Sequence, residues 1–421
     1  MSTSIDLKAA TRTFLAQTEG HLATYLEGCV HCGACADACH FYVASGDPRH
    51  TPAYKLFPIV KVHRSHKFPF GWFGFARPIG ERDLREWEEL LFDTCTMCGR
   101  CTMICPMGID IAAIVAGARR AFVAAGLGPP DLLAAADSSR DHGSPLGVTA
   151  DKLRERIEWI ADDNGVTIPL DAPKADVLLT LSSVETMKYP KSVAAMAKLL
   201  NHAGVSWTLS TKGYEATNFG YLAGKGDIAK TMVERIVTAA GSVGAKTVVI
   251  PECGHAYGVL RWSAAAMLGR PLPFQVLHIS EFLARLKRDG KLRLTPFDEP
   301  MTYHDPCQVS RRGGATADAR DVLNGFARNF REMTPTGDEN WCCGGGGGVQ
   351  AIERAAPLRH QVFKLKMDQV ERTGAKTMVS ACSNCRLTMD ESKAHWQWQG
   401  GIDSLVEIVA DHLVEAPRQS R

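Results

Sequence analysis

The chain has 421 residues, of which 45% are hydrophobic and 22% charged, as in ordinary soluble globular proteins. Its 48 Lys and Arg nearly balance 46 Asp and Glu, and the net charge of +2 with no basic run gives no reason to expect nucleic acid as a partner. No apolar stretch reaches the roughly 18–20 residues that span a bilayer, and the N-terminus lacks a signal-peptide core, so we expect a cytoplasmic protein without a transmembrane segment.

Fourteen cysteines indicate the class of the protein. Disulfides are rare in the cytosol, so cysteines at short spacings there indicate metal ligands or redox groups. Eight of them form two runs near the N-terminus, five lie in the last third, and Cys253 stands alone.

The predicted elements of the first third are helical. Apolar residues at helical spacing over 6–28 lead into the first cysteine run, and helices are expected at 81–93 and 109–126 around the second. The aromatic, Gly- and Pro-rich segment 68–78 cannot be a regular helix, and we expect it to roof the metal sites, with partner docking as the alternative. We assign 1–125 to one helical domain and 126–172 to a linker with one amphipathic helix at 151–163.

The two cysteine runs have matching spacing, with gaps of two, two and three residues. Such gaps let three thiolates of one loop converge on three corners of a cubane [4Fe–4S] cluster, and in two-cluster ferredoxins the fourth cysteine ligates the other cluster. Zinc and disulfides are the alternatives. A zinc ion bound by two CxxC pairs, however, would leave the remaining cysteines of each run without a metal. The predicted sets are Cys29, Cys32, Cys35 with Cys105, and Cys95, Cys98, Cys101 with Cys39.

Two further features accompany these runs. Gly33 and Gly99 occupy matching positions, where a small residue lets the backbone approach cluster sulfur. His40 follows Cys39, whereas Pro106 follows Cys105. His40 could tune a cluster potential through a hydrogen bond, but a solvent-facing or core-satisfied histidine is the commoner case.

From about residue 174, short apolar strands alternate with helices. Strands are expected at 175–181, 205–210 and 246–251 and helices at 192–204 and 228–241, which indicates an α/β fold with a largely parallel sheet. Residues 244–257 align without gaps to 374–387, an offset of 130. This repeat predicts two tandem α/β modules, at 173–295 and 296–421, with Cys253 displaced by one position from the cysteine of the second copy.

The last module contains a second cysteine pattern, in which the adjacent cysteines 342 and 343 are followed by five glycines at 344–348. Five cysteines exceed the needs of one zinc ion or one cubane, and a disulfide between adjacent cysteines is strained. Both thiolates of an adjacent pair can instead face one metal assembly, beside which glycines let the backbone lie close. A zinc site on four of the five is the alternative. The set is Cys307, Cys342, Cys343, Cys382 and Cys385.

This pattern resembles a known family. The module with Cys342–Cys343–Gly344 is similar to the cysteine-rich (CCG) domain of heterodisulfide reductase and of the iron–sulfur subunits of glycolate oxidase and anaerobic glycerol-3-phosphate dehydrogenase. A helical two-cluster domain followed by two such modules resembles the D-type subunit of heterodisulfide reductase. The resemblance implies a non-cubane [4Fe–4S] cluster on the five cysteines of the last module.

The chain departs from catalytic members of this family, because its first module keeps only Cys253. That departure favours electron relay, and no catalytic residue is assigned. The resemblance implies an electron-transfer subunit between a flavoprotein dehydrogenase acting on a small organic substrate and a quinone, an electron-transfer flavoprotein or a membrane redox complex, at the inner face of the membrane. A catalytic subunit of a heterodisulfide or disulfide reductase is the alternative.

No G-x-G-x-x-G follows a strand, so we expect neither FAD nor NAD on this chain. Cys253 and His255 could line a docking or redox site, although an inert buried cysteine and a packed histidine are commoner.

Overall fold

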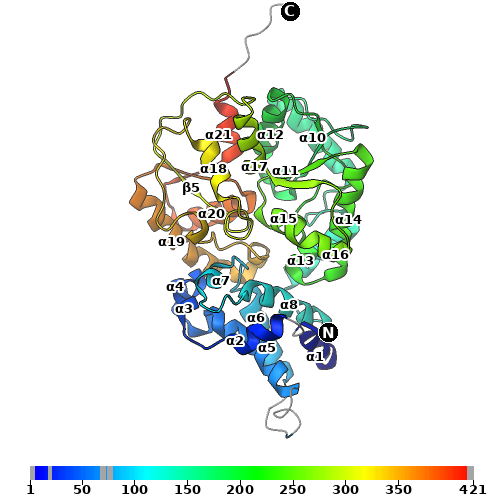
Figure 1. The fold of residues 1–421 in the computed structure, drawn as a ribbon, viewed down its shortest axis with the longest axis vertical. Helices are drawn as coiled ribbons and strands as arrows, with labels where there is room; N and C mark the ends of the chain where they lie inside the picture. The colour runs from blue at the N-terminus through cyan, green and yellow to red at the C-terminus, as the bar shows by residue number, and fades with distance from the viewer. Residues whose placement is uncertain (1–4, 18–20, 67–72, 74–78, 415–421) are drawn as a thin grey trace, which may run out of the picture. The chain divides into compact units, whose positions relative to one another are not determined.

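The structure is a computed structural model that describes residues 5–17, 21–66, 73 and 79–414 (Figure 1). The aromatic segment at 68–78, expected to roof the metal sites, lies outside the described residues except for Phe73. The chain divides into two compact units. The first unit comprises Met1–Ser139, Phe219–Ala229 and Trp341–Lys366, and the second comprises Arg140–Asn218, Lys230–Asn340 and Met367–Arg421.

The first unit is built from helices around α8 (Ile111–Ala124), against which α1, α5, α6 and α13 pack. Asp110 accepts a hydrogen bond from the amide of Ala113 and so caps α8. Its other helices are α1 (Leu7–Gln17), α2 (His21–Gly28), α3 (Ala34–Asp37), α4 (His40–Ser45), η1 (Pro48–His50), α5 (Pro52–His66), α6 (Glu81–Phe92), α7 (Arg100–Ile104), α9 (Pro130–His142), α13 (Phe219–Ala223), η4 (Val349–Ala351) and η5 (Glu353–Ala355).

Aromatic packing fixes the centre of this unit. The ring of Phe122 on α8 meets Phe14 edge-on at 5.8 Å and Phe92 at 6.1 Å, and all three side chains are buried. The helices expected at 81–93 and 109–126 are confirmed as α6 and α8. The apolar positions over 6–28 fall on two helices, α1 and α2.

The second unit contains two parallel sheets of short strands. One has the order β2-β1-β3-β4 and the other β5-β6-β7, and all of their named pairings are parallel. One hydrophobic cluster includes residues of both sheets, such as Val249 on β3 and Val379 on β6. The strands are β1 (Val177–Leu179), β2 (Trp207–Thr208), β3 (Thr247–Ile250), β4 (Gln275–His278), β5 (Met301–His304), β6 (Thr377–Ser380) and β7 (Gly401–Ser404).

Helices connect and cover these strands. The boundary between the units falls within α14 (Gly226–Val243), α19 (Ala356–Thr373) and the last turn of α9. The remaining helices of the second unit are α10 (Ala150–Asn164), α11 (Ser183–Lys188), α12 (Pro190–His202), α15 (Gly254–Gly258), η2 (Val259–Ser263), α16 (Ala264–Leu268), α17 (Ile279–Arg288), α18 (Thr316–Leu323), η3 (Gly337–Glu339), α20 (Ser383–Trp396) and α21 (Leu405–Asp411).

The expected α/β alternation is present. Each predicted strand contains an observed one, and the predicted helices at 192–204 and 228–241 are α12 and α14. The elements α14 and β3 recur as α19 and β6 at the same offset of 130 residues. The segment 126–172 contains the expected helix, α10, and also α9. Among the described residues, no helix has the length and apolarity required to cross a membrane.

Candidate metal centres

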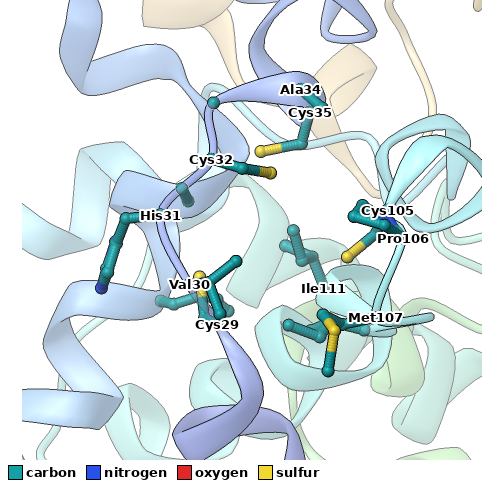
Figure 2. A pocket seen from close by; sticks show the side chains of 14 residues that line it. Cys29, Val30, His31, Cys32, Ala34, Cys35, Cys105, Pro106, Met107 and Ile111 are labelled. Carbon is teal, nitrogen blue, oxygen red and sulfur yellow. The ribbon is translucent and has the colours of Figure 1, made fainter.

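The first candidate centre lies where α2 ends. Cys29 follows α2, Cys35 lies in α3, and Cys105 follows α7. Together with Cys32 they line one cavity with an empty volume of about 410 Å³. Figure 2 shows the sulfur atoms of Cys32, Cys35 and Cys105 directed toward the same space. The cavity therefore gathers the four thiols that the sequence assigns to one cluster.

The backbone of the two cysteine runs repeats. His31 and Met97, each just before the second cysteine, have left-handed φ values of 53° and 54°. Gly33 and Gly99 are left-handed as well, at 82° and 75°, and each immediately precedes a short helix. Glycine adopts this conformation without the steric cost of a Cβ, so the matched glycines allow both loops to make the same tight turn.

The second candidate centre combines cysteines from both runs. Cys39, Cys95, Cys98 and Cys101 line a cavity with an empty volume of about 350 Å³. Cys39 reaches it from the first run, as Cys105 reaches the other cavity from the second run. Each cavity thus combines three cysteines of one run with the fourth cysteine of the other, a crosswise grouping. That these cysteines ligate clusters remains a prediction.

The electrostatics of the second cavity suit bound iron cations. Burial, followed by the neighbouring Cys98, Cys95 and Cys39, raises the pKa of Cys101 well above its usual value. Burial also raises the pKa of Cys95. Crowded thiolates repel one another, and bound iron relieves that repulsion and holds thiolates in their deprotonated form. Four soft sulfur donors on one cavity are the donor set of a [4Fe–4S] cluster.

A buried lysine faces this centre, and no sequence motif indicated it. Lys55 on α5 is only 2% exposed. Its Nζ donates to the carbonyl oxygen of His50 at 2.8 Å and lies 3.8 Å from the Sγ of Cys39. A buried ammonium group needs nearby negative charge, and cysteines of this cavity would supply it once deprotonated.

The adjacent cysteines 342 and 343 belong to the first unit. The Sγ of Cys342 lies 3.5 Å from the Oγ1 of Thr96, and the amide of Gly344 donates to that sulfur at 3.5 Å. The neighbouring Trp341 ring stacks on the guanidinium of Arg100, 3.7 Å from its centroid. The segment 341–348 therefore lies on the second cysteine run, within one compact unit.

The close approach of segment 341–348 to the second cysteine run requires glycine. A Cβ on Gly347 would lie 2.8 Å from the carbonyl carbon of Thr96 and 2.9 Å from the carbonyl oxygen of Cys95, and its φ is +64°. One on Gly348 would lie 2.8 Å from Leu132. The glycine run, expected to lie beside a cluster of the last module, thus also brings the chain against the backbone of the second cysteine run.

Arg119 on α8 forms buried hydrogen bonds that hold the glycine run against the second cysteine run. Its side chain has no exposed surface, and burial lowers its pKa to about 10. The guanidinium donates to the carbonyl oxygens of Leu91, Cys95, Leu222 and Gly347. One buried side chain therefore connects α6, the second cysteine run, α13 and the glycine run, a role that no sequence motif indicated.

The other three cysteines of the last module are buried in the second unit. Cys307 follows β5, Cys382 directly precedes α20, and Cys385 lies in the first turn of that helix. A hydrogen bond with Cys385 lowers the pKa of Cys382 despite its burial. Because Cys342 and Cys343 belong to the first unit, ligation of one cluster by all five cysteines remains a prediction.

Cys253 occupies a position equivalent to that of Cys382. Each is the N-cap of the helix that follows a corresponding strand, β3 for Cys253 and β6 for Cys382. The gapless alignment of 244–257 with 374–387 places Cys253 one residue away from Cys382. The two cysteines are nevertheless equivalent in structure, because each is the N-cap of its helix. Cys253 is buried and its Sγ lies 3.5 Å from the Oγ1 of Thr217. Burial, followed by the neighbouring Cys382, raises the pKa of Cys253.

Two family models match the chain. Residues 25–109 match the 4Fe-4S dicluster domain, and residues 301–390 match the cysteine-rich domain CCG. The first range contains both cysteine runs, and the second contains the five cysteines of the last module.

Curated relatives match most of the chain. An Hdr-like menaquinol oxidoreductase iron–sulfur subunit of Archaeoglobus profundus is 28% identical over 93% of this chain and 80% of that protein. The D-type subunit of the dihydromethanophenazine:CoB–CoM heterodisulfide reductase of Methanosarcina barkeri is 26% identical over 97% of both proteins. The EtfAB:quinone oxidoreductase of Syntrophomonas wolfei is 27% identical over 86% of this chain and 54% of that protein. The chain thus carries a 4Fe-4S dicluster domain and a CCG cysteine-rich domain and is similar to D-type subunits of heterodisulfide reductase, which confirms the resemblance drawn from its motifs.

Proposed function

We propose that this chain is an iron–sulfur electron-transfer subunit of an oxidoreductase complex. The observation that carries the proposal is the crosswise gathering of eight cysteines into two cavities, four in each. Four thiolates around one small cavity suit a [4Fe–4S] cluster, and two neighbouring clusters suit the passage of single electrons. The names of the relatives, which include two quinone-linked oxidoreductases, support the same function.

The proposed ligand sets follow the cavities. Cys29, Cys32, Cys35 and Cys105 hold cluster 1, and Cys39, Cys95, Cys98 and Cys101 hold cluster 2. A third, non-cubane cluster in the last of two tandem α/β modules completes the set of cofactors, without FAD or NAD. The clusters supply one-electron redox chemistry, while the protein orients the thiolates, excludes water and supplies buried cations such as Lys55. The proposed ligands of the third cluster are Cys307, Cys342, Cys343, Cys382 and Cys385.

The proposed partners follow from the relatives. Because one relative is named an EtfAB:quinone oxidoreductase and another a menaquinol oxidoreductase subunit, we assign a flavoprotein and a quinone-linked membrane complex to the two ends of the electron path. A flavoprotein dehydrogenase acting on a small organic substrate is the donor, and the chain acts at the cytoplasmic face of the membrane.

A catalytic disulfide reductase is the second candidate function. It is favoured by the similarity to a CoB–CoM heterodisulfide reductase subunit that spans 97% of both proteins. It is disfavoured by the module at 173–295, whose single cysteine, Cys253, cannot supply the five ligands of a second non-cubane cluster.

One assay separates the two functions. The purified full-length chain is mixed anaerobically with reduced viologen and the CoB–CoM heterodisulfide, and viologen oxidation is followed by absorbance. The relay predicts reduction of the clusters without turnover, and reoxidation only when an acceptor protein or quinone-linked complex is added. Heterodisulfide cleavage at enzymatic rates by the chain alone would overturn the relay.

A further inference from the structure

His40 occupies an unusual position beside the second candidate centre. It is the first residue of α4, directly after Cys39, where the other run has Pro106 after Cys105. Its side chain is only 2% exposed and lines the cavity that contains Cys39, Cys95, Cys98 and Cys101. The ring packs against Phe41, with the two centroids 4.4 Å apart. His40 is therefore a buried polar side chain and not a surface histidine.

The ring nitrogens of His40 have no conventional partner. Within the described part of the chain, neither nitrogen makes a hydrogen bond. Leaving a buried N–H without an acceptor costs about 1–3 kcal/mol, so a histidine that only fills space here would be destabilising. A core histidine satisfied by backbone or hydroxyl oxygens is thus excluded, as is a solvated one.

Two cysteine sulfur atoms lie close to this imidazole. A ring nitrogen of His40, the Sγ of Cys98 and the Sγ of Cys342 all lie within 4.8 Å of one another. Cys98 is a proposed ligand of cluster 2, and Cys342 is a proposed ligand of the third cluster. Both belong to the same compact unit as His40. The imidazole therefore lies beside one proposed ligand of cluster 2 and one proposed ligand of the third cluster.

We propose that, once cluster 2 is bound, a ring N–H of His40 donates a hydrogen bond to the Cys98 thiolate and thereby sets the reduction potential of cluster 2, while the ring also lies near Cys342. This inference rests on the proposed function, because it requires cluster 2 to be present. A hydrogen bond to a ligand sulfur stabilises the reduced, more negative state of a cluster, so it raises the reduction potential. His40 acts through the ligand and is a positioning residue.

The test compares three variants of the full-length protein by EPR-monitored redox titration. His40→Leu removes the donor at similar volume, and His40→Gln retains an N–H. His50→Gln is the matched control, because the His50 ring pairs with the Oγ of Ser45 at 2.8 Å. For His40→Leu we expect the equilibrium constant for reducing cluster 2 to fall about tenfold, or about 59 mV for a one-electron couple. We expect a smaller fall for His40→Gln, none for His50→Gln, and an unchanged potential of cluster 1 in all three.

A second measurement uses the unsubstituted protein. Labelling histidine with ¹⁵N and recording electron spin echo envelope modulation on reduced cluster 2 should reveal a ¹⁵N coupling that His40→Gln abolishes and His50→Gln retains. If His40→Leu fails to assemble, this coupling still decides the proposal.

The outcomes against the proposal are distinct. An unchanged cluster 2 potential in an iron-replete His40→Leu protein, or no ¹⁵N coupling in the unsubstituted protein, overturns the role of His40 and leaves the proposed function intact. A bound zinc ion that is lost on substitution of His40 would identify these residues as a separate metal site and would also overturn it. Absence of iron from the unsubstituted protein would contradict the proposed function itself.

Discussion

The guanidinium of Arg119 donates to the carbonyl oxygen of Cys95 at 2.9 Å from a side chain with no exposed surface. The same side chain donates to Leu222 at 2.8 Å and to Gly347. Residues far apart in the sequence thus share one buried donor group. The conformation of the second cysteine run therefore depends on segments near residues 222 and 347 as well as on its own spacing.

Replacing Arg119 with Met should destabilise the first unit by about 3–5 kcal/mol, because several buried carbonyl oxygens lose their donor. The neighbouring Arg120 is exposed, so Arg120→Met is the matched control and should change stability by less than about 0.5 kcal/mol. Anaerobic thermal unfolding followed by circular dichroism measures the difference. Equal melting temperatures for the two variants would show that the buried network contributes little.

Paired cysteine substitutions test the crosswise ligand sets. Cys29→Ser with Cys105→Ser removes two ligands from one cavity, so EPR should still show one unperturbed cubane and iron should fall by about four atoms per chain. Cys29→Ser with Cys39→Ser removes one ligand from each cavity, so both cubane signals should change. If the second pair, which comes from one run, left one cubane unperturbed, each run would hold its own cluster.

Gly347→Ala should disrupt the contact between the glycine run and the second cysteine run. The added Cβ would clash with backbone atoms of Thr96 and Cys95, and overpacking of this kind costs about 1–3 kcal/mol beyond the strain of a positive φ. Gly126 has φ +78° with open space around it, so Gly126→Ala measures the strain alone. The clash predicts a larger loss of stability and of cluster 2 content for Gly347→Ala, and similar losses for both variants would argue against it.

Buried glutamates should make the stability of the second unit depend on pH. Burial raises the pKa of Glu185 to about 8 and that of Glu215 to about 7. The folded state therefore retains protons that the unfolded state releases above about pH 4.5, and stability falls as pH rises toward 8. The slope reaches at most about 1.4 kcal/mol per pH unit for each group.

Glu185→Gln should flatten this dependence, because the amide cannot ionise. Apparent melting temperatures at pH 5 and pH 8 provide the measurement, with exposed Glu158→Gln on α10 as control. An unaltered pH dependence in Glu185→Gln would mean that Glu185 is ionised in the folded protein.

The sequence predicted the elements that depend on patterns within a short stretch of residues. Cysteine spacing, the apolar periodicity of α8 and the alternation around β1–β3 are all encoded within short windows, and the structure reproduces the corresponding loops, helix and strands. The matching φ values at Gly33 and Gly99 likewise follow from the matching spacing of the two runs.

The supporting residues could not be found in this way. Lys55 and Arg119 carry no motif, and they matter because the fold buries them next to groups many residues away. The role of the glycine run depends on Gly347 meeting Thr96, a contact between residues about 250 positions apart that no local pattern encodes. His40 could be singled out only as the residue replacing proline, whereas its burial and its lack of oxygen partners emerge from the packing.

Iron and acid-labile sulfide analysis of the anaerobically purified full-length chain, combined with EPR of its reduced form, tests the central claim most directly. Two cubanes and one four-iron cluster predict about 12 iron atoms per chain and the signals of two neighbouring reduced cubanes. Stoichiometric zinc without iron or sulfide would contradict the account.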